Sequence, residues 1–165
     1  MTTSAARKAT IPVIRRAAAD DLAACAEIIN DWIDETDWHP RLKPREEIAA
    51  LFNPQLLERR AIWLAELDGQ AVGYVSVKTD EAFVVALFVR PAARGLGIGA
   101  MLLDRARQMY PGGLNLSVYE LNTGAQRFYL REGFAEVPEG RNDDTEEGVP
   151  TLLMRWDGTD RADEG

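Results

Sequence analysis

The chain has 165 residues, 46% of them hydrophobic, and a formal net charge of −8 at pH 7. This length and apolar content predict one globular domain with a single core. The sequence contains no basic stripe of the kind that binds nucleic acid and no apolar run of the roughly 20 residues that span a bilayer. We therefore expect neither a nucleic-acid partner nor a membrane association.

The charge and the single cysteine suggest how the chain is organised. Nine acidic and three basic residues follow Pro138, so most of the negative charge falls in residues 142–148 and in the tail, both expected to be solvated or disordered. We expect a flexible arm at 1–10, one domain at 11–157 and an acidic flexible tail at 158–165. Cys25 lacks a disulfide partner and metal-ligand neighbours, which predicts a small buried side chain, no metal site and a cytoplasmic protein.

The first half of the chain alternates strands and helices. A short strand is predicted at 13–15, followed by a helix that begins at Asp20 or Asp21. Its apolar face carries Leu22, Cys25, Ile28, Ile29 and Trp32. A loop at 35–44 leads to a second helical segment at 45–52. Strands at 61–67 and 71–77 are joined by Asp68-Gly69, a strong hairpin signal.

A glycine-rich turn follows the next strand, predicted at 83–89. Residues 95–99 read Gly-Leu-Gly-Ile-Gly and open a helix with Ile98, Leu102, Ala106 and Met109 on one face. A glycine turn at a helix N-terminus suits a pyrophosphate, because backbone N–H groups converge there and the helix end is partially positive. No lysine follows the glycines as a P-loop requires, and the spacing is one residue short of the Gly-x-Gly-x-x-Gly dinucleotide fingerprint.

A second helix with a clear start and end follows a strand predicted at 114–118. Asn122 is a plausible N-cap, and Ala125, Phe128 and Glu132 share one face. Gly133 is typical of a helix end. The pattern closes with strands at 134–137 and 151–156.

These two segments together resemble the GNAT superfamily of N-acetyltransferases. Arg94-x-x-Gly97-x-Gly99 is similar to its acyl-CoA signature, and Asn122-x-x-Ala125-x-x-Phe128-Tyr129-x-x-x-Gly133-Phe134 to its second signature. The resemblance runs from about residue 13 to 156 and is strongest at 83–134. It implies an α+β, three-layer α/β fold, in which a mixed, strongly twisted sheet of about seven strands is flanked by helices. The strands at 83–89 and 114–118 would splay apart to admit acyl-CoA.

The resemblance also implies roles for individual residues. The backbone of Leu87, Phe88 and Val89 would position the thioester, and Asn122 would contact the pantetheine arm. The pyrophosphate would be bound by the turn residues Arg94, Gly95, Leu96, Gly97, Ile98, Gly99 and Ala100.

Two catalytic residues are expected. The Tyr129 phenol, protonated at neutral pH, would give a proton to the departing thiolate, although a core aromatic is the alternative interpretation. Glu81 is the family-like general base, with Asp80 beside it. His39, the only histidine, lies in the loop that walls the acceptor site in relatives and is a weaker candidate.

The predicted function is transfer of an acetyl group from acetyl-CoA to a primary amine by direct attack, with a small-molecule amine favoured over a protein N-terminus. The alternative is a non-catalytic CoA-binding sensor or interaction module of the same fold. Many relatives form dimers, which implies a homodimer. The acceptor, the general base and the use of other acyl donors stay open.

Overall fold

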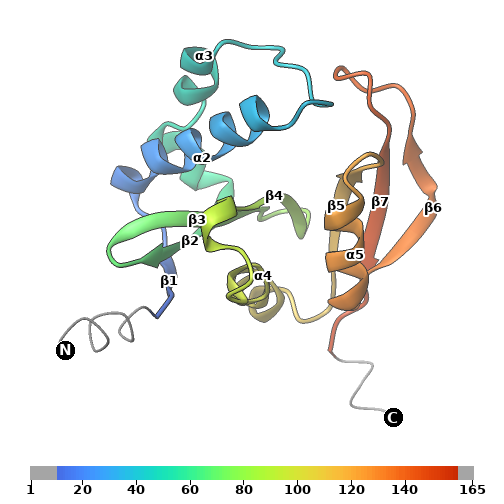
Figure 1. The fold of residues 1–165 in the computed structure, drawn as a ribbon. Helices are drawn as coiled ribbons and strands as arrows, with labels where there is room; N and C mark the ends of the chain where they lie inside the picture. Colours follow the sequence, from blue (N-terminus) through green and yellow to red (C-terminus); the bar gives the residue numbers. More distant parts are fainter. Residues whose placement is uncertain (1–10, 160–165) are drawn as a thin grey trace, which may run out of the picture.

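Seven strands form one mixed sheet between helices on both faces in the computed structural model, which describes residues 11–159 (Figure 1). The strand order is β1-β2-β3-β4-β5-β7-β6, and β4 and β5 are the one parallel pair among the described strands. This arrangement confirms the predicted three-layer fold. The expected arm at 1–10 and residues 160–165 of the expected tail lie outside the described residues.

All seven predicted strands are present, with small differences in their ends. The strands are β1 (Val13–Arg16), β2 (Arg60–Leu67), β3 (Gln70–Lys78), β4 (Phe83–Val89), β5 (Leu114–Tyr119), β6 (Ala135–Asn142) and β7 (Thr151–Trp156). The α-helices are α2 (Leu22–Glu35), α3 (Arg45–Ala50), α4 (Ile98–Met109) and α5 (Thr123–Arg131). Short 3-10 segments are η1 (Ala19–Asp21), η2 (Pro54–Glu58) and η3 (Pro91–Ala93).

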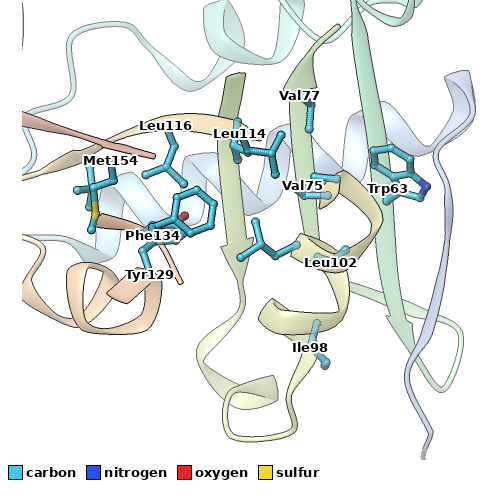
Figure 2. Close-up of a cluster of buried hydrophobic side chains, with 14 of the residues drawn as sticks. Trp63, Val75, Val77, Ile98, Leu102, Leu114, Leu116, Tyr129, Phe134 and Met154 are labelled. Atoms are coloured by element: carbon cyan, nitrogen blue, oxygen red, sulfur yellow. The ribbon is translucent and has the colours of Figure 1, made fainter. Parts of the chain in front are cut away.

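The sheet has a separate hydrophobic cluster on each face. On one face, Leu22, Cys25 and Ile28 of α2 pack against Ile62 and Tyr74 of the sheet. On the other face, α4 and α5 pack against the sheet in a larger cluster (Figure 2) that includes Trp63, Val75, Val77, Ile98, Leu102, Leu114, Leu116, Tyr129, Phe134 and Met154. The sheet is therefore covered on both faces, as the apolar runs of its central strands require.

Several local expectations are met for the predicted physical reasons. Asp68 and Gly69 both have positive φ, 51° and 78°, as a two-residue type I′ hairpin needs. Cys25 is completely buried, and burial raises the pKa of its thiol to about 12. Met109, predicted on the apolar face of its helix, is an exception, since it is the last residue of α4 and is 40% exposed.

β4 and β5 separate soon after they begin. They pair only at Phe83–Asn115 and Val84–Leu116, whereas β4 stays paired with β3 as far as Val89. The β3–β4 register shifts at the same point, so Val85 is an extra residue that bulges out of β4. A bulge bends the strand that carries it. From Val85 onward the edge of β4 therefore faces an opening instead of β5, as the resemblance implies.

Candidate functional site

A cleft of about 600 Å³ occupies the opening between β4 and β5. Its walls come from the end of β4, the glycine turn, the start of α4, and α5. Residues expected to bind acyl-CoA that line it are Leu87, Phe88, Val89, Arg94, Gly95, Gly97, Ile98, Gly99, Ala100 and Asn122. Residues for which the sequence predicted no binding role also line it: Trp32, Ala93, Gly124, Ala125, Phe128, Arg131 and Glu132.

The glycine turn has the backbone conformation that the sequence predicts. Gly95 and Gly97 have φ of 84° and 80°, a left-handed conformation that strains other residues, and Gly97 is the N-cap of α4. A Cβ at Gly95 would meet no atom within 4 Å, so the space beside the turn is open. Gly99 has another role, because a Cβ there would lie 3.3 Å from Phe128 Cζ. It allows α4 and α5 to approach closely.

The opposite wall is the start of α5. The Ala125 backbone N–H donates to Asn122 Oδ1 over 3.1 Å, which confirms Asn122 as the helix N-cap. Gly133 follows the helix with φ of 96°, as a helix-ending glycine does. Two helix N-termini, those of α4 and α5, thus border one cleft, and both favour negative charge.

The charged residues of the cleft include two arginines. Arg94 Nε donates to the Val89 carbonyl over 3.3 Å, which places this side chain at the junction of β4 and the glycine turn. Arg131 lines the cleft from the last turn of α5. Guanidinium groups suit phosphate oxygens, because their N–H donors match the phosphate geometry.

Tyr129 belongs both to the cleft wall and to the core. It is 8% exposed, and its ring packs against Phe128 and Phe134 with centroid separations of 5.2 and 5.6 Å. Burial raises the pKa of its phenol, so the hydroxyl keeps its proton at neutral pH. The two alternatives for Tyr129, core aromatic and cleft hydroxyl, are therefore compatible.

Two expected site residues lie away from the cleft. Glu81 lies in the turn before β4, whereas the cleft begins at Leu87, so the strand from Phe83 to Leu87, roughly 13 Å long at about 3.3 Å per residue, lies between them. This placement does not support Glu81 as a base that contacts substrate. Leu96 is half exposed and does not line the cleft, although its neighbours Gly95 and Gly97 do.

A cluster of five rings lies on the α2 side of the opening, and for two of them, Trp32 and Tyr119, the sequence had predicted no role in the site. Trp32 lies at its centre, with ring centroids 5.0 Å from His39, 5.2 Å from Phe88, 5.8 Å from Trp38 and 6.4 Å from Tyr119. Trp32 and Phe88 also line the cleft. His39 Nε2 lies 3.2 Å from the Tyr119 hydroxyl, a hydrogen bond between residues 80 positions apart.

The acidic loop between β6 and β7 reaches the same ring cluster. Burial and the Glu147 carboxylate raise the pKa of Tyr119 to about 12. Burial lowers the pKa of His39, and the charge of Glu147 opposes that shift. Thr145 fixes the end of this loop, because its Oγ1 donates to the Val149 carbonyl and accepts from the Val149 N–H. The expected solvated loop is therefore ordered and contributes a carboxylate to this side of the opening.

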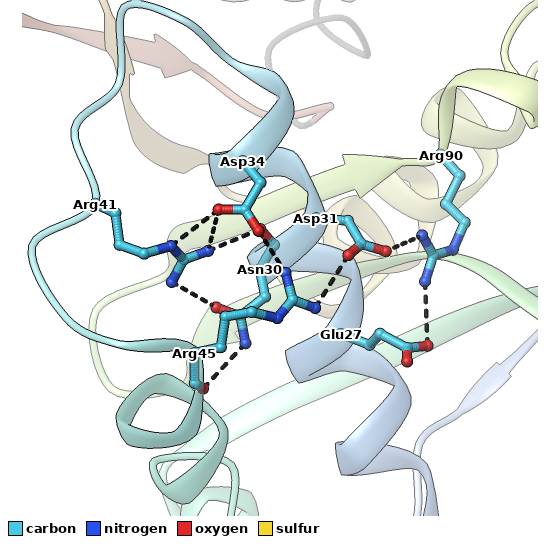
Figure 3. A network of polar contacts seen from close by, with 7 residues as sticks. All are labelled: Glu27, Asn30, Asp31, Asp34, Arg41, Arg45 and Arg90. Atoms are coloured by element: carbon cyan, nitrogen blue, oxygen red, sulfur yellow. Dashed lines mark hydrogen bonds and ion pairs between the residues drawn. The ribbon is translucent and has the colours of Figure 1, made fainter.

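A network of ion pairs anchors the loop that carries Trp38 and His39 (Figure 3). Arg41 donates to the Asn30 carbonyl and to Asp34, and Arg45 pairs with both Asp31 and Asp34. Asp31 also pairs with Arg90, which directly follows β4. The acceptor-side loop, helix α2 and the end of β4 are thus tied together by side chains.

Among residues 11–159, no group of three or more histidine, cysteine, aspartate or glutamate side chains could hold a metal ion. None of the helices in this range is both long enough and apolar enough to cross a bilayer.

Comparisons with known proteins agree with the geometry. The family model described as "Acetyltransferase (GNAT) domain" matches residues 58–136. The peptidyl-lysine N-acetyltransferase YiaC of Escherichia coli (strain K12) is 34% identical over 147 residues, which cover 87% of this chain and 96% of YiaC. The peptidyl-lysine N-acetyltransferase YjaB of Salmonella typhimurium is 34% identical over 110 residues, covering 66% of this chain and 71% of YjaB.

Solved structures share the fold. The solution structure of apo-form YjaB from Escherichia coli superposes with a TM-score of 0.69 at 28% identity, covering 90% of this chain and 99% of YjaB. The structure of YncA from Salmonella typhimurium, described as a putative acetyltransferase with its cofactor acetyl-CoA, gives a TM-score of 0.67 at 23% identity, covering 89% of this chain and 94% of YncA.

Proposed function

The chain belongs to the GNAT family of acetyltransferases, and on that premise we propose that it acetylates the side-chain amine of lysine residues with acetyl-CoA as donor. It is an acetyl-CoA-dependent N-acetyltransferase. The observation that carries this proposal is the splayed β4–β5 pair, whose opening is bordered by a glycine turn, two helix N-termini and a buried tyrosine.

We assign acetyl-CoA, the acetyl donor, to the cleft because of the residues that line it. The pyrophosphate binds the backbone N–H groups of the turn at 95–100, with Arg94 as counter-ion. The pantetheine arm lies along the unpaired edge of β4 at Leu87–Val89 and passes Asn122. Arg131, on the α5 side of the same cleft, is a second cation for the donor's phosphates.

Tyr129 is the general acid of this proposal. As the amine attacks the thioester carbonyl, the carbon–sulfur bond breaks and its electron pair goes to sulfur. Tyr129 protonates that sulfur, so that CoA leaves as a thiol. A phenol with a raised pKa holds its proton until the thiolate forms.

A lysine side chain is favoured as acceptor over the small-molecule amine that the sequence alone suggested. The relatives that cover most of this chain are named peptidyl-lysine N-acetyltransferases. In addition, the α2 side of the opening presents aromatic faces and the Glu147 carboxylate, and both attract a primary ammonium group.

The test uses acetyl-CoA with three acceptors in parallel. The first is a peptide with a blocked N-terminus and one internal lysine, the second the same peptide with a free N-terminus and arginine in place of lysine, and the third spermidine as a small amine. We expect CoA release and a mass gain of one acetyl group with the first peptide. If only spermidine is acetylated, the acceptor is a small-molecule amine. If none of the three acceptors is acetylated, the result supports the non-catalytic alternative.

Two further parts of the proposal concern the protein's surroundings. We infer a cytoplasmic location from the single, buried cysteine, and a homodimer from the family resemblance. Light scattering of the purified chain measures the second directly.

A further inference from the structure

The β4–β5 opening is bordered by side chains from both faces of the sheet, and the two faces present different residues. Leu87 and Val89 pack with the α4–α5 cluster, which also contains Tyr129. Phe88 packs with the α2 cluster on the other face. A thioester in the opening therefore has the tyrosine of α5 on one side and the α2 ring cluster on the other.

Tyr119 lies on the α2 side, across the opening from Phe88. Along β5 the residues Leu114, Leu116 and Val118 belong to the α4–α5 cluster, so Tyr119 points to the opposite face because side chains alternate along a strand. Its ring is stacked on Trp32, with an interplanar angle of 21°, and Trp32 lines the cleft. The Tyr119 backbone carbonyl accepts from the N–H of Asn122 over 2.9 Å, and Asn122 lines the cleft, so Tyr119 lies directly behind the cleft wall.

We propose that Tyr119 and His39 form the proton relay that deprotonates the acceptor amine, with Glu147 stabilising the charge that the relay acquires. The inference rests on the proposed function, because it needs an amine that enters from the α2 side. It replaces Glu81, which lies at the other end of β4.

The relay works as follows. The acceptor ammonium gives one proton to Tyr119 Oη, while the Tyr119 hydroxyl proton moves to His39 Nε2 along the 3.2 Å hydrogen bond. The free amine then attacks the thioester, and the thiolate takes a proton from Tyr129. The second proton lost by nitrogen returns to Tyr129 through solvent, so the net products are the amide, the CoA thiol and an imidazolium.

The charges around His39 suit this task. Its ring lies between Tyr119 of β5, the Glu147 carboxylate of the β6–β7 loop and Arg41 of its own loop, while the α2 residue beside it is the uncharged Trp32. Burial lowers the pKa of His39, so the ring is neutral and able to accept a proton at neutral pH. The charge of Glu147 favours the protonated ring, which offsets part of the cost of the imidazolium once it forms.

The structure also shows what keeps the relay in place. His39 belongs to the loop that Arg41 ties to Asn30 and Asp34 of α2. The loop itself is turned by a bond from the His39 N–H to the Thr36 carbonyl over 3.0 Å. In Figure 1 this loop and the β6–β7 loop approach one another above the gap between β4 and β5.

The decisive experiment is the pH profile of kcat/KM for the internal-lysine peptide in His39→Gln and Tyr119→Phe variants. Glutamine keeps a polar group near Tyr119 but does not titrate. A positioned general base contributes about 10²–10⁴-fold, so we expect a loss of at least about a hundredfold at pH 7. The loss should shrink as the pH approaches about 10.4, because a free lysine amine then needs no base.

The controls separate this inference from structural damage and from the proposed function. Acetyl-CoA affinity by calorimetry should be unchanged in both variants, and Asp37→Asn, an exposed carboxylate of the same loop, should keep the wild-type profile. A loss equal at all pH values, or one produced by Glu81→Gln instead, would overturn the relay. If the wild-type protein does not acetylate the lysine peptide, the proposed function has failed, not the relay.

Discussion

Replacing Gly97 by alanine tests whether the glycine turn binds the donor through its backbone. Gly97 has φ of 80°, and a left-handed conformation costs an alanine about 1–2 kcal/mol. The added Cβ would meet only Met101 Cε, at 3.9 Å, so it collides with nothing inside the protein. It would instead project beside the backbone that the pyrophosphate must approach.

The expected loss of CoA affinity follows from the hydrogen bonds that the backbone of the turn would donate to the pyrophosphate. A hydrogen bond to a charged group contributes about 1.5–3 kcal/mol, and losing one of them raises Kd by about tenfold to a hundredfold. Calorimetry with CoA measures this change in Kd, and thermal unfolding measures the stability loss separately. The two effects can therefore be assigned to different causes.

Gly69→Ala is a matched control. Gly69 has φ of 78° and open space within 4 Å, but it lies in the β2–β3 hairpin and is not part of the cleft wall. We expect the same loss of stability in both variants and loss of CoA affinity in Gly97→Ala alone. A folded Gly97→Ala protein with wild-type affinity, or an equal loss in both variants, would refute backbone binding at the turn.

Three other expectations concern single residues. Tyr129→Phe should lower kcat by about 10²–10⁴-fold with acetyl-CoA affinity unchanged, and near-normal turnover would leave Tyr129 only its core role. Asn122→Ala removes the N-cap acceptor of α5 and should cost about 1 kcal/mol of unfolding free energy in a denaturant titration, while an unchanged midpoint would contradict the cap. Asp21, hydrogen-bonded to Arg15, has its pKa lowered from 3.8 to about 2, so its ionised form stabilises the fold above pH 3.8. Asp21→Asn should thus lower Tm at pH 7, and the difference should shrink strongly as the pH falls to about 2; a constant difference across that range would argue against the pair.

The sequence predicted the fold well because its signals are local. The Asp68-Gly69 hairpin, the Asn122 cap and the glycine turn each depend on a few adjacent residues whose backbone preferences decide the conformation. The helical spacing predicts Met109 on the buried face of α4. It is exposed because α4 ends there, beyond the part of the helix that packs on the sheet.

The contacts on the α2 side of the opening could not be predicted in this way, although Phe88 and His39 were both expected near the site. Trp32, His39, Tyr119 and Glu147 come from four separate segments, and no pattern in the chain links them. Their contacts depend on how α2 and the β6–β7 loop meet over the separated strands, which is a property of the tertiary structure. The placement of Glu81 has a similar origin, because its distance from the cleft depends on where β4 and β5 stop pairing.

The bulge at Val85 determines which side of the sheet each later residue of β4 faces. Val84 packs on the α4–α5 side, and if Val85 were a regular strand residue, Ala86 and Phe88 would face that side too, since side chains alternate along a strand. Ala86 and Phe88 instead pack on the α2 side, while Leu87 and Val89 face α4. If the bulge were lost and Val85 took a regular place in the strand, these two sets would be exchanged, which would turn Phe88 away from Trp32 and place a bulky ring where Leu87 now borders the cleft. The bulged residue thus shifts the alternation of side chains in β4 by one position. This shift sets which residues face α2 and which face α4 on the two sides of the cleft.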